Sequence, residues 1–177
     1  HGNHDLTCRE GAESSTGVTL SKSEVSSKFR DVTGPGAVYN ASDAASLYYY
    51  VDNAAAGIRY IVVDVFDECQ GSNVYWGVLP GVSQTQMDWV LGNAVMNAPE
   101  NSKLVVISHF APGFNTGVST LNAALAALSA HEDYGSYAFS SRPDLELFLV
   151  LGGHQHHDMQ LNRSGVWYVQ SLSDACY

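Results

Sequence analysis

Apolar residues recur at helical spacing in three segments of the chain, and each segment predicts an amphipathic helix. The first begins at the capping-box pair Ser21 and Glu24. The second begins at the capping-box pair Ser83 and Gln86, and the third covers residues 119–130. In the second segment the apolar positions fall at i, i+3, i+4, i+7 and i+8, and they are Met87, Val90, Leu91, Ala94 and Val95.

Short and almost wholly apolar runs alternate with these helical segments and predict buried strands. The expected strands are residues 47–51, 60–66, 103–108, 147–151 and 166–170. The first two are joined by a turn-rich connection, so we expect them to form a hairpin. Strands that alternate with helices predict an α/β fold with a layered arrangement around a mostly buried sheet. No repeat or linker divides the 177 residues, which suit a single domain.

Charge and composition exclude several classes of function. Eight Lys and Arg residues stand against 18 Asp and Glu, which gives a formal net charge of −10. We therefore expect no broad nucleic-acid-binding surface, because such a surface must be basic. No apolar run approaches the roughly 18 residues of a membrane span, so none is expected. The three cysteines are far apart and form neither a zinc-ribbon nor a disulfide pattern.

Three histidine-containing clusters stand at a glycine-marked turn or directly after an expected strand: residues 2–5, 108–112 and 153–158. The carboxyl ends of parallel strands converge on one crevice, where ligands bind. Imidazole nitrogen and amide oxygen are suitable ligands for Zn, Fe or Mn. Together the clusters predict a metal site.

Each cluster also has a structural explanation. Taken alone, residues 2–5 fit a hydrogen-bonded loop, and His109 fits a histidine at the end of a strand. Three histidines after one buried strand, in residues 153–158, are harder to explain by packing. His131 lies beside two acidic residues, and we expect it on the solvated surface.

In this order the three clusters resemble the last three sequence blocks of the calcineurin-like metallophosphoesterases. The Gly-His-x-His pattern of residues 153–156 is the most specific of them. The resemblance extends to residues 48–64, which are similar to the central hairpin of the family, and to residues 83–91, which are similar to a helix that contains Trp89. It therefore covers most of the chain and implies a metallophosphoesterase-like β-sheet sandwich flanked by helices.

The resemblance implies hydrolysis of a phosphate ester by a water that divalent metal ions activate. It assigns Asn3, His109 and His154 as ligands of one ion and His156 as a ligand of a second ion. His4 would be the catalytic histidine near the leaving-group oxygen, with Asp5 as its acidic partner. Gln155 and Asp158 would hydrogen-bond to the ligand imidazoles. The complete domain would hold two Mn, Fe or Zn ions. Its substrate would be a small phosphate ester or a phosphoprotein.

The chain departs from the family at its start. The first two blocks of the family, Asp-x-His and Gly-Asp-x-x-Asp, occur nowhere in the sequence. We therefore expect residues 1–177 to be a single calcineurin-like phosphoesterase domain that lacks its N-terminal strands and holds one metal ion or none by itself. Missing strands would leave an exposed sheet edge, through which we expect self-association.

Two other functions stay open at this point. The chain is a catalytically silent scaffold or interaction module if the missing blocks abolish activity. It is a mononuclear zinc hydrolase if Asn3, His109 and His154 hold a single ion with an open position for water.

Overall fold

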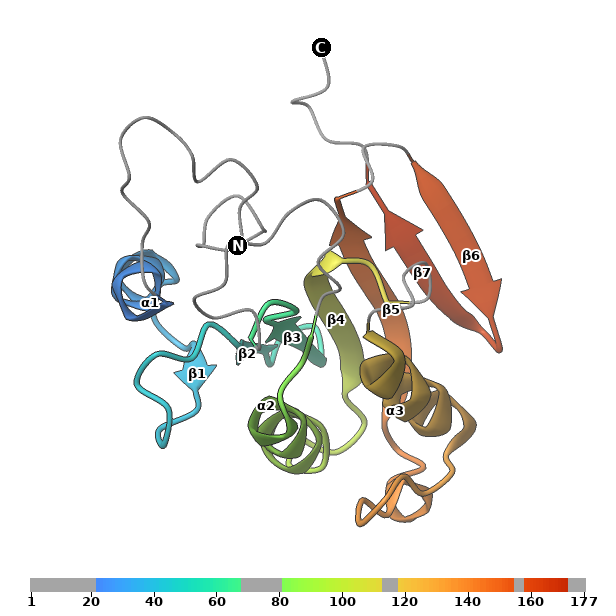
Figure 1. Ribbon diagram of the computed structural model, residues 1–177. Coiled ribbons are helices and arrows are strands. Elements are labelled where there is room, and N and C mark those ends of the chain that lie inside the picture. The colour runs from blue at the N-terminus through green and yellow to red at the C-terminus, as the bar shows by residue number, and fades with distance from the viewer. Residues whose placement is uncertain (1–21, 68–80, 113–117, 155–157, 172–177) are drawn as a thin grey trace.

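The computed structural model describes residues 22–67, 81–112, 118–154 and 158–171, and it has a mixed α/β fold (Figure 1). The described strands form one seven-stranded sheet in the order β1-β2-β3-β4-β5-β7-β6. The strands are β1 (Val38–Tyr39), β2 (Tyr49–Asn53), β3 (Ile58–Val63), β4 (Lys103–Phe110), β5 (Glu146–Gly153), β6 (Met159–Arg163) and β7 (Val166–Gln170). The central strands β3, β4, β5 and β7 are parallel, and antiparallel pairs flank them on both sides.

Helices connect the parallel strands. Helix α2 (Gln84–Trp89) continues as the π-helix η1 (Val90–Val95) and leads from β3 to β4, while α3 (Ser119–Ala130) leads from β4 to β5. Both lie on the same side of the sheet (Figure 1). Helix α1 (Lys22–Val32) stands beside β1, and a short 3-10 turn, η3 (Phe139–Ser141), precedes β5. No helix in the described ranges is long and apolar enough to cross a bilayer.

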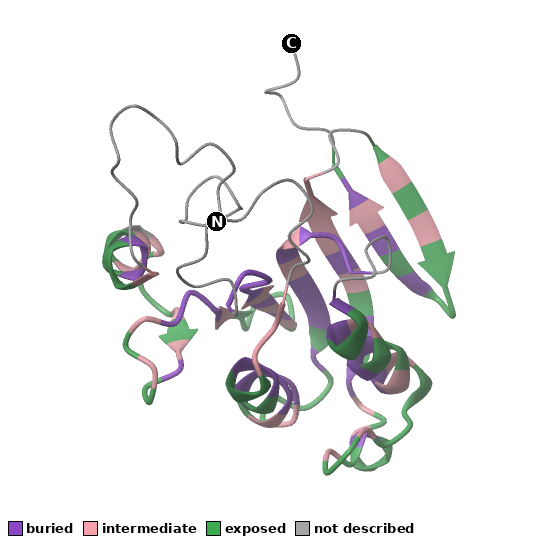
Figure 2. Ribbon diagram, viewed as in Figure 1, coloured by how far each residue is buried: buried purple, intermediate pink, exposed green. Residues whose placement is uncertain are grey.

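The face of the sheet toward α2 and α3 holds the core. Aligned residues on neighbouring parallel strands face the same side, and on this side Ile61, Val106, Val150 and Tyr168 are all buried. They pack against buried apolar residues of both helices in one cluster. Figure 2 shows the corresponding purple bands on the strands and on the inner sides of the helices.

The opposite face of the central strands is apolar but more open. Ile107, Leu151 and Val169 share it and are only partly buried, and Trp167 retains 47% of its exposure. Helix α1 reaches this face at the β1 edge, where the Arg30 guanidinium lies 4.4 Å from the centre of the Tyr39 ring. Parallel sheets are usually covered on both faces, and the described helices cover the central strands of this sheet on one face.

The structure confirms the α/β fold class and most of the expected elements. Ser83 caps α2 by accepting a hydrogen bond from the backbone N–H of Gln86 at 3.1 Å, as the capping-box pattern predicts. The helix at residues 119–130, the hairpin and the strand at residues 166–170 are also confirmed. The sandwich expected from the resemblance needs two sheets, whereas the described residues form a single sheet.

Strand boundaries differ from the sequence-based expectation in the hairpin. The strands expected at residues 47–51 and 60–66 are β2 at 49–53 and β3 at 58–63. Leu47 and Tyr48 are buried because they pack into the core ahead of the strand. Their apolar character therefore reflects burial and does not indicate that they pair within the sheet. The strands also extend further into the connection than expected and leave residues 54–57 as the turn, at which the Ala56 N–H donates a hydrogen bond to the Asn53 side chain at 3.2 Å.

Candidate functional site

Two of the histidines selected from the sequence meet at the carboxyl edge of the sheet. His109 is the next-to-last residue of β4, and His154 follows β5 directly. These strands are parallel neighbours, so their ends lie side by side. The Nε2 atom of His109 lies 3.0 Å from the Nδ1 atom of His154, and the two rings are nearly perpendicular, with centroids 5.0 Å apart.

A close backbone approach brings these two residues together. A Cβ atom added to Gly152 would lie 2.3 Å from the Cα atom of Ala111, the first residue after β4. A side chain at position 152 is therefore incompatible with the path of the chain beyond His109. The glycine allows β5 to run against that path and to deliver His154 beside its partner.

His154 has an unusual backbone conformation. Its φ angle is +78°, in the left-handed region that a residue with a side chain seldom adopts. Its ring packs against Phe110, with centroids 3.8 Å apart, which holds the imidazole in place. Strained backbone of this kind is concentrated at functional sites.

A buried carboxylate stands at the end of the next strand. Asp64 follows β3 directly and is 1% exposed. The side-chain amide of Gln86, in α2, binds both of its backbone groups: the Asp64 N–H donates to Oε1 and the Nε2 donates to the Asp64 carbonyl, each at 2.8 Å. Burial raises the pKa of the Asp64 carboxyl, against the opposing effects of the Lys22 charge and of the hydrogen bond from the Phe66 N–H.

The Lys22 ammonium joins Asp64 to a second carboxylate. It lies 3.6 Å from Oδ2 of Asp64 and makes a hydrogen bond and ion pair with Asp67. The Ser83 hydroxyl, at the start of α2, also donates to Asp67. All three charged side chains are less than a tenth exposed. This cluster therefore ties α1 and α2 to the end of β3, because removal of one partner would leave a buried charge uncompensated.

Asp64, Asp67 and Lys22 were not among the residues selected from the sequence. The apolar run at residues 60–66 placed Asp64 inside an expected strand, whereas β3 ends at Val63 and leaves Asp64 directly after it. The segment that contains these carboxylates reaches the histidines through Phe66, whose ring centroid is 5.8 Å from that of His109.

The other sequence-selected residues are placed as follows. Asn3, His4, Asp5, Gln155 and His156 lie outside the described residues. Asp158 is exposed and immediately precedes β6. His131 is exposed at the end of α3, as expected. Among the residues that the structure describes, no three His, Cys, Asp or Glu side chains are grouped closely enough to hold a metal ion.

An open depression of about 490 Å³ lies beside His109. Apolar side chains of Val62, Ile107 and Leu151 line it together with Ser171, whose N–H donates to the Gly152 carbonyl at 3.0 Å. This volume is within the range of small-molecule sites, which is about 300–1,000 Å³. His109 thus borders a space in which a small ligand fits.

Comparison with known proteins gives no match: a scan against protein-family models, a search of curated proteins and a search of solved structures each found none.

Proposed function

We propose that this chain carries part of the active site of a metal-dependent phosphoesterase of the calcineurin-like type. The observation that carries the proposal is the 3.0 Å separation between the ring nitrogens of His109 and His154 at the carboxyl edge of the sheet. The order and spacing of the three histidine-containing clusters supply the reaction class. The proposal includes a metallophosphoesterase-like sandwich, in which a second sheet covers the open face of this one.

The two imidazoles fit a shared metal ion. Nitrogen ligands lie about 2.0–2.1 Å from zinc, so two ligands of one ion are separated by roughly 2.8–3.4 Å for angles between a right angle and the tetrahedral value. The observed distance lies within this range. Two imidazoles complete only part of a metal site, and in the proposal Asn3 is the third ligand of the same ion.

The residues of the chain have separate tasks in the proposed reaction. When bound, two divalent ions would supply charge neutralisation for the phosphate and activation of a water molecule. His109 and His154 would hold one ion, and His156 would contribute to the other. His4, oriented by Asp5, lies near the leaving-group oxygen and gives it a proton as the ester bond breaks. Gln155 and Asp158 hydrogen-bond to the ligand imidazoles and fix their orientation.

The test measures hydrolysis of p-nitrophenyl phosphate and of its diester with added Mn²⁺, Zn²⁺ or Fe²⁺. The variants are His109→Ala and His154→Ala, with His131→Asn as the matched control, because His131 is an exposed histidine outside the site. We expect metal binding to fall in the two site variants, and any metal-dependent hydrolysis by the chain to fall with it by about 100-fold or more, since each variant removes a ligand. The control should retain the full rate.

Metal content per chain, measured by elemental analysis, separates the alternatives. Two ions per chain with hydrolysis support the binuclear enzyme. One ion that depends on His109 and His154, without hydrolysis, favours the silent scaffold. The proposal fails if the protein binds no metal ion, or if both alanine variants bind metal as the unchanged protein does.

A further inference from the structure

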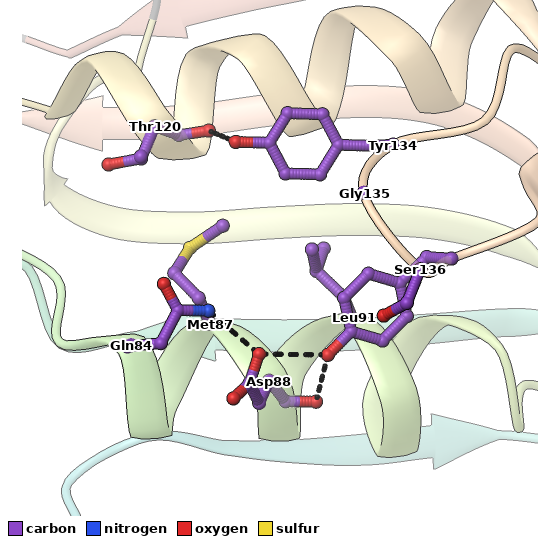
Figure 3. Close-up of a pocket in the computed structure, with 9 residues that line it drawn as sticks. Gln84, Met87, Asp88, Leu91, Thr120, Tyr134, Gly135 and Ser136 are labelled. Atoms are coloured by element: carbon purple, nitrogen blue, oxygen red, sulfur yellow. Dashed lines mark hydrogen bonds between the residues drawn. The ribbon is translucent and has the colours of Figure 1, made fainter.

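A second cavity lies on the helix-covered side of the sheet, away from the histidine pair. It occupies about 330 Å³ between α2 and α3 and is bordered by the turn at residues 134–137 (Figure 3). It has no lining residue in common with the depression beside His109. The side chains that define it are Gln84, Met87, Asp88, Leu91, Tyr134 and Tyr137.

The turn presents two tyrosines to this cavity. The backbone N–H of Tyr134 donates to the carbonyl of Tyr137 at 3.0 Å, and the reverse bond is 2.9 Å long. Residues paired in this way carry their side chains on the same side of the hairpin. Gly135, between them, has a φ angle of +57°, which a tight hairpin turn requires.

Both tyrosine hydroxyls are held by the helices. The Tyr134 hydroxyl donates to the carbonyl of Thr120 in α3 at 3.3 Å, and the Tyr137 hydroxyl donates to Oδ1 of Asp88 in α2 at 3.0 Å. Burial and the neighbouring Asp88 carboxylate raise the pKa of Tyr137, so this hydroxyl stays protonated as a donor near neutral pH. The two rings are therefore fixed as walls of the cavity.

The base and the charge of the cavity come from α2. Met87 and Leu91 are 4% and 1% exposed, and Figure 3 shows the Met87 side chain directed into the space between the helices. Asp88 is the single charged residue of the lining. Gln84 Nε2 donates to its Oδ1 at 2.8 Å, the same atom that Tyr137 binds. The Oδ2 atom of Asp88 receives no hydrogen bond from the part of the chain that the structure describes.

We propose that this cavity binds a small organic cation, an alkyl- or arylammonium or guanidinium ion, as a free molecule. The cationic group pairs with the Asp88 carboxylate, and the apolar part lies on Met87 beside the tyrosine rings. Aromatic faces attract cations within about 6 Å of the ring centre. The formal net charge of −10 favours approach of a cation. The volume suits an amine of only a few carbon atoms, since it is at the lower end of ligand-site sizes.

The chain offers a direct reporter of binding. Its three methionines are Met87, Met96 and Met159, and Met87 is the one in the cavity lining. We would label the methionine methyl groups with ¹³C and follow their NMR signals during titration with n-butylammonium. The uncharged control ligand is 1-butanol, which has the same carbon chain. The expected result is a saturable shift of the Met87 signal by the cation, weakened by added salt, with Met96 and Met159 unchanged.

Two aspartate variants test the role of charge. Asp88→Asn keeps the size of the side chain and an acceptor for Tyr137, and should weaken butylammonium binding at least tenfold. Asp31→Asn removes the same charge from the exposed side of α1 and should leave binding within about twofold, because distant surface charges are screened. Unchanged Met96 and Met159 signals show that each variant is folded.

Three results overturn the proposal: no Met87 shift up to about 20 mM butylammonium, an equal shift with 1-butanol, or equal binding by Asp88→Asn and the unchanged protein. If Asp88→Asn does not fold, the Tyr137→Phe variant tests the proposal in its place. It keeps the ring but loses the bond that orients Asp88, and it should weaken binding while the salt dependence persists.

Discussion

Gly152 lies so close to the backbone of Ala111 that an added Cβ atom would be 2.3 Å from the Ala111 Cα atom. The neighbouring Gly153 is different, since its nearest contact for such an atom is the His109 carbonyl at 3.9 Å, an ordinary van der Waals distance. Neither glycine has a positive φ angle. The requirement at position 152 is therefore for space, and it arises where β4 and β5 bring the two histidines together.

Gly152→Ala should destabilise the protein and Gly153→Ala should not. At position 152 the new methyl group meets backbone, which cannot move aside as a flexible side chain can. We expect a loss of about 1–3 kcal/mol in the free energy of unfolding, as for overpacked cores. Urea denaturation measures it, and Gly153→Ala is the matched control with an expected change below about 1 kcal/mol. Equal losses in the two variants would contradict the steric explanation.

Gln86→Leu should be strongly destabilising, because Gln86 satisfies both backbone groups of the buried Asp64. Leucine has about the same size but leaves the N–H and the carbonyl without partners. Each buried unsatisfied group costs about 1–3 kcal/mol, so a loss of roughly 2–6 kcal/mol is expected. Gln84→Leu, on the exposed side of the same helix, should stay within about 0.5 kcal/mol. Thermal unfolding of the two variants makes the comparison, and similar melting temperatures would refute the role given to Gln86.

The elements that sequence patterns predicted well are those whose apolar residues pack against one another. The helix at residues 119–130 is an example, since its apolar side faces the core. Strands β1 and β6 were not predicted. Strand β6 is Met-Gln-Leu-Asn-Arg, a polar edge strand with no buried residue, and tertiary pairing with β7 forms it.

For the site, the sequence could predict which strand ends carry chemistry but not how their side chains meet. His109 and His154 come together as the strand-end argument predicted. The same argument missed Asp64, because the apolar run at residues 60–66 placed it inside an expected strand, whereas β3 ends at Val63. Its partner Lys22 could not be found this way, because it lies 42 residues earlier in the chain and reaches Asp64 only through the placement of α1.

Stability should depend on the protonation of Asp64. Burial raises its pKa above the ordinary value of 3.8, so the folded protein keeps a proton that the unfolded chain releases. The resulting stabilisation is fully present below pH 3.8 and is lost as the pH rises through the folded pKa, by about 1.4 kcal/mol for each unit of the upward shift. Unfolding free energies across this range should show the decrease in the unchanged protein. Asp64→Asn should remove it, whereas Asp31→Asn, on the surface of α1, should preserve it. The same pH dependence in Asp64→Asn would assign it to another group.

Self-association, expected from the sequence through a sheet edge, should instead use the open face of the sheet. The edge strand β6 is polar, whereas Trp167 on the open face is 47% exposed beside partly buried apolar neighbours. Apolar surface of this kind drives association when nothing covers it. Sedimentation velocity should reveal a concentration-dependent dimer that Trp167→Lys weakens by about tenfold or more, equivalent to at least about 1.4 kcal/mol. Val38→Lys adds the same charge at a residue that is 42% exposed on β1, and it should leave the dimer unchanged. An equal effect of the two substitutions would mean that net charge, and not the open face, governs association.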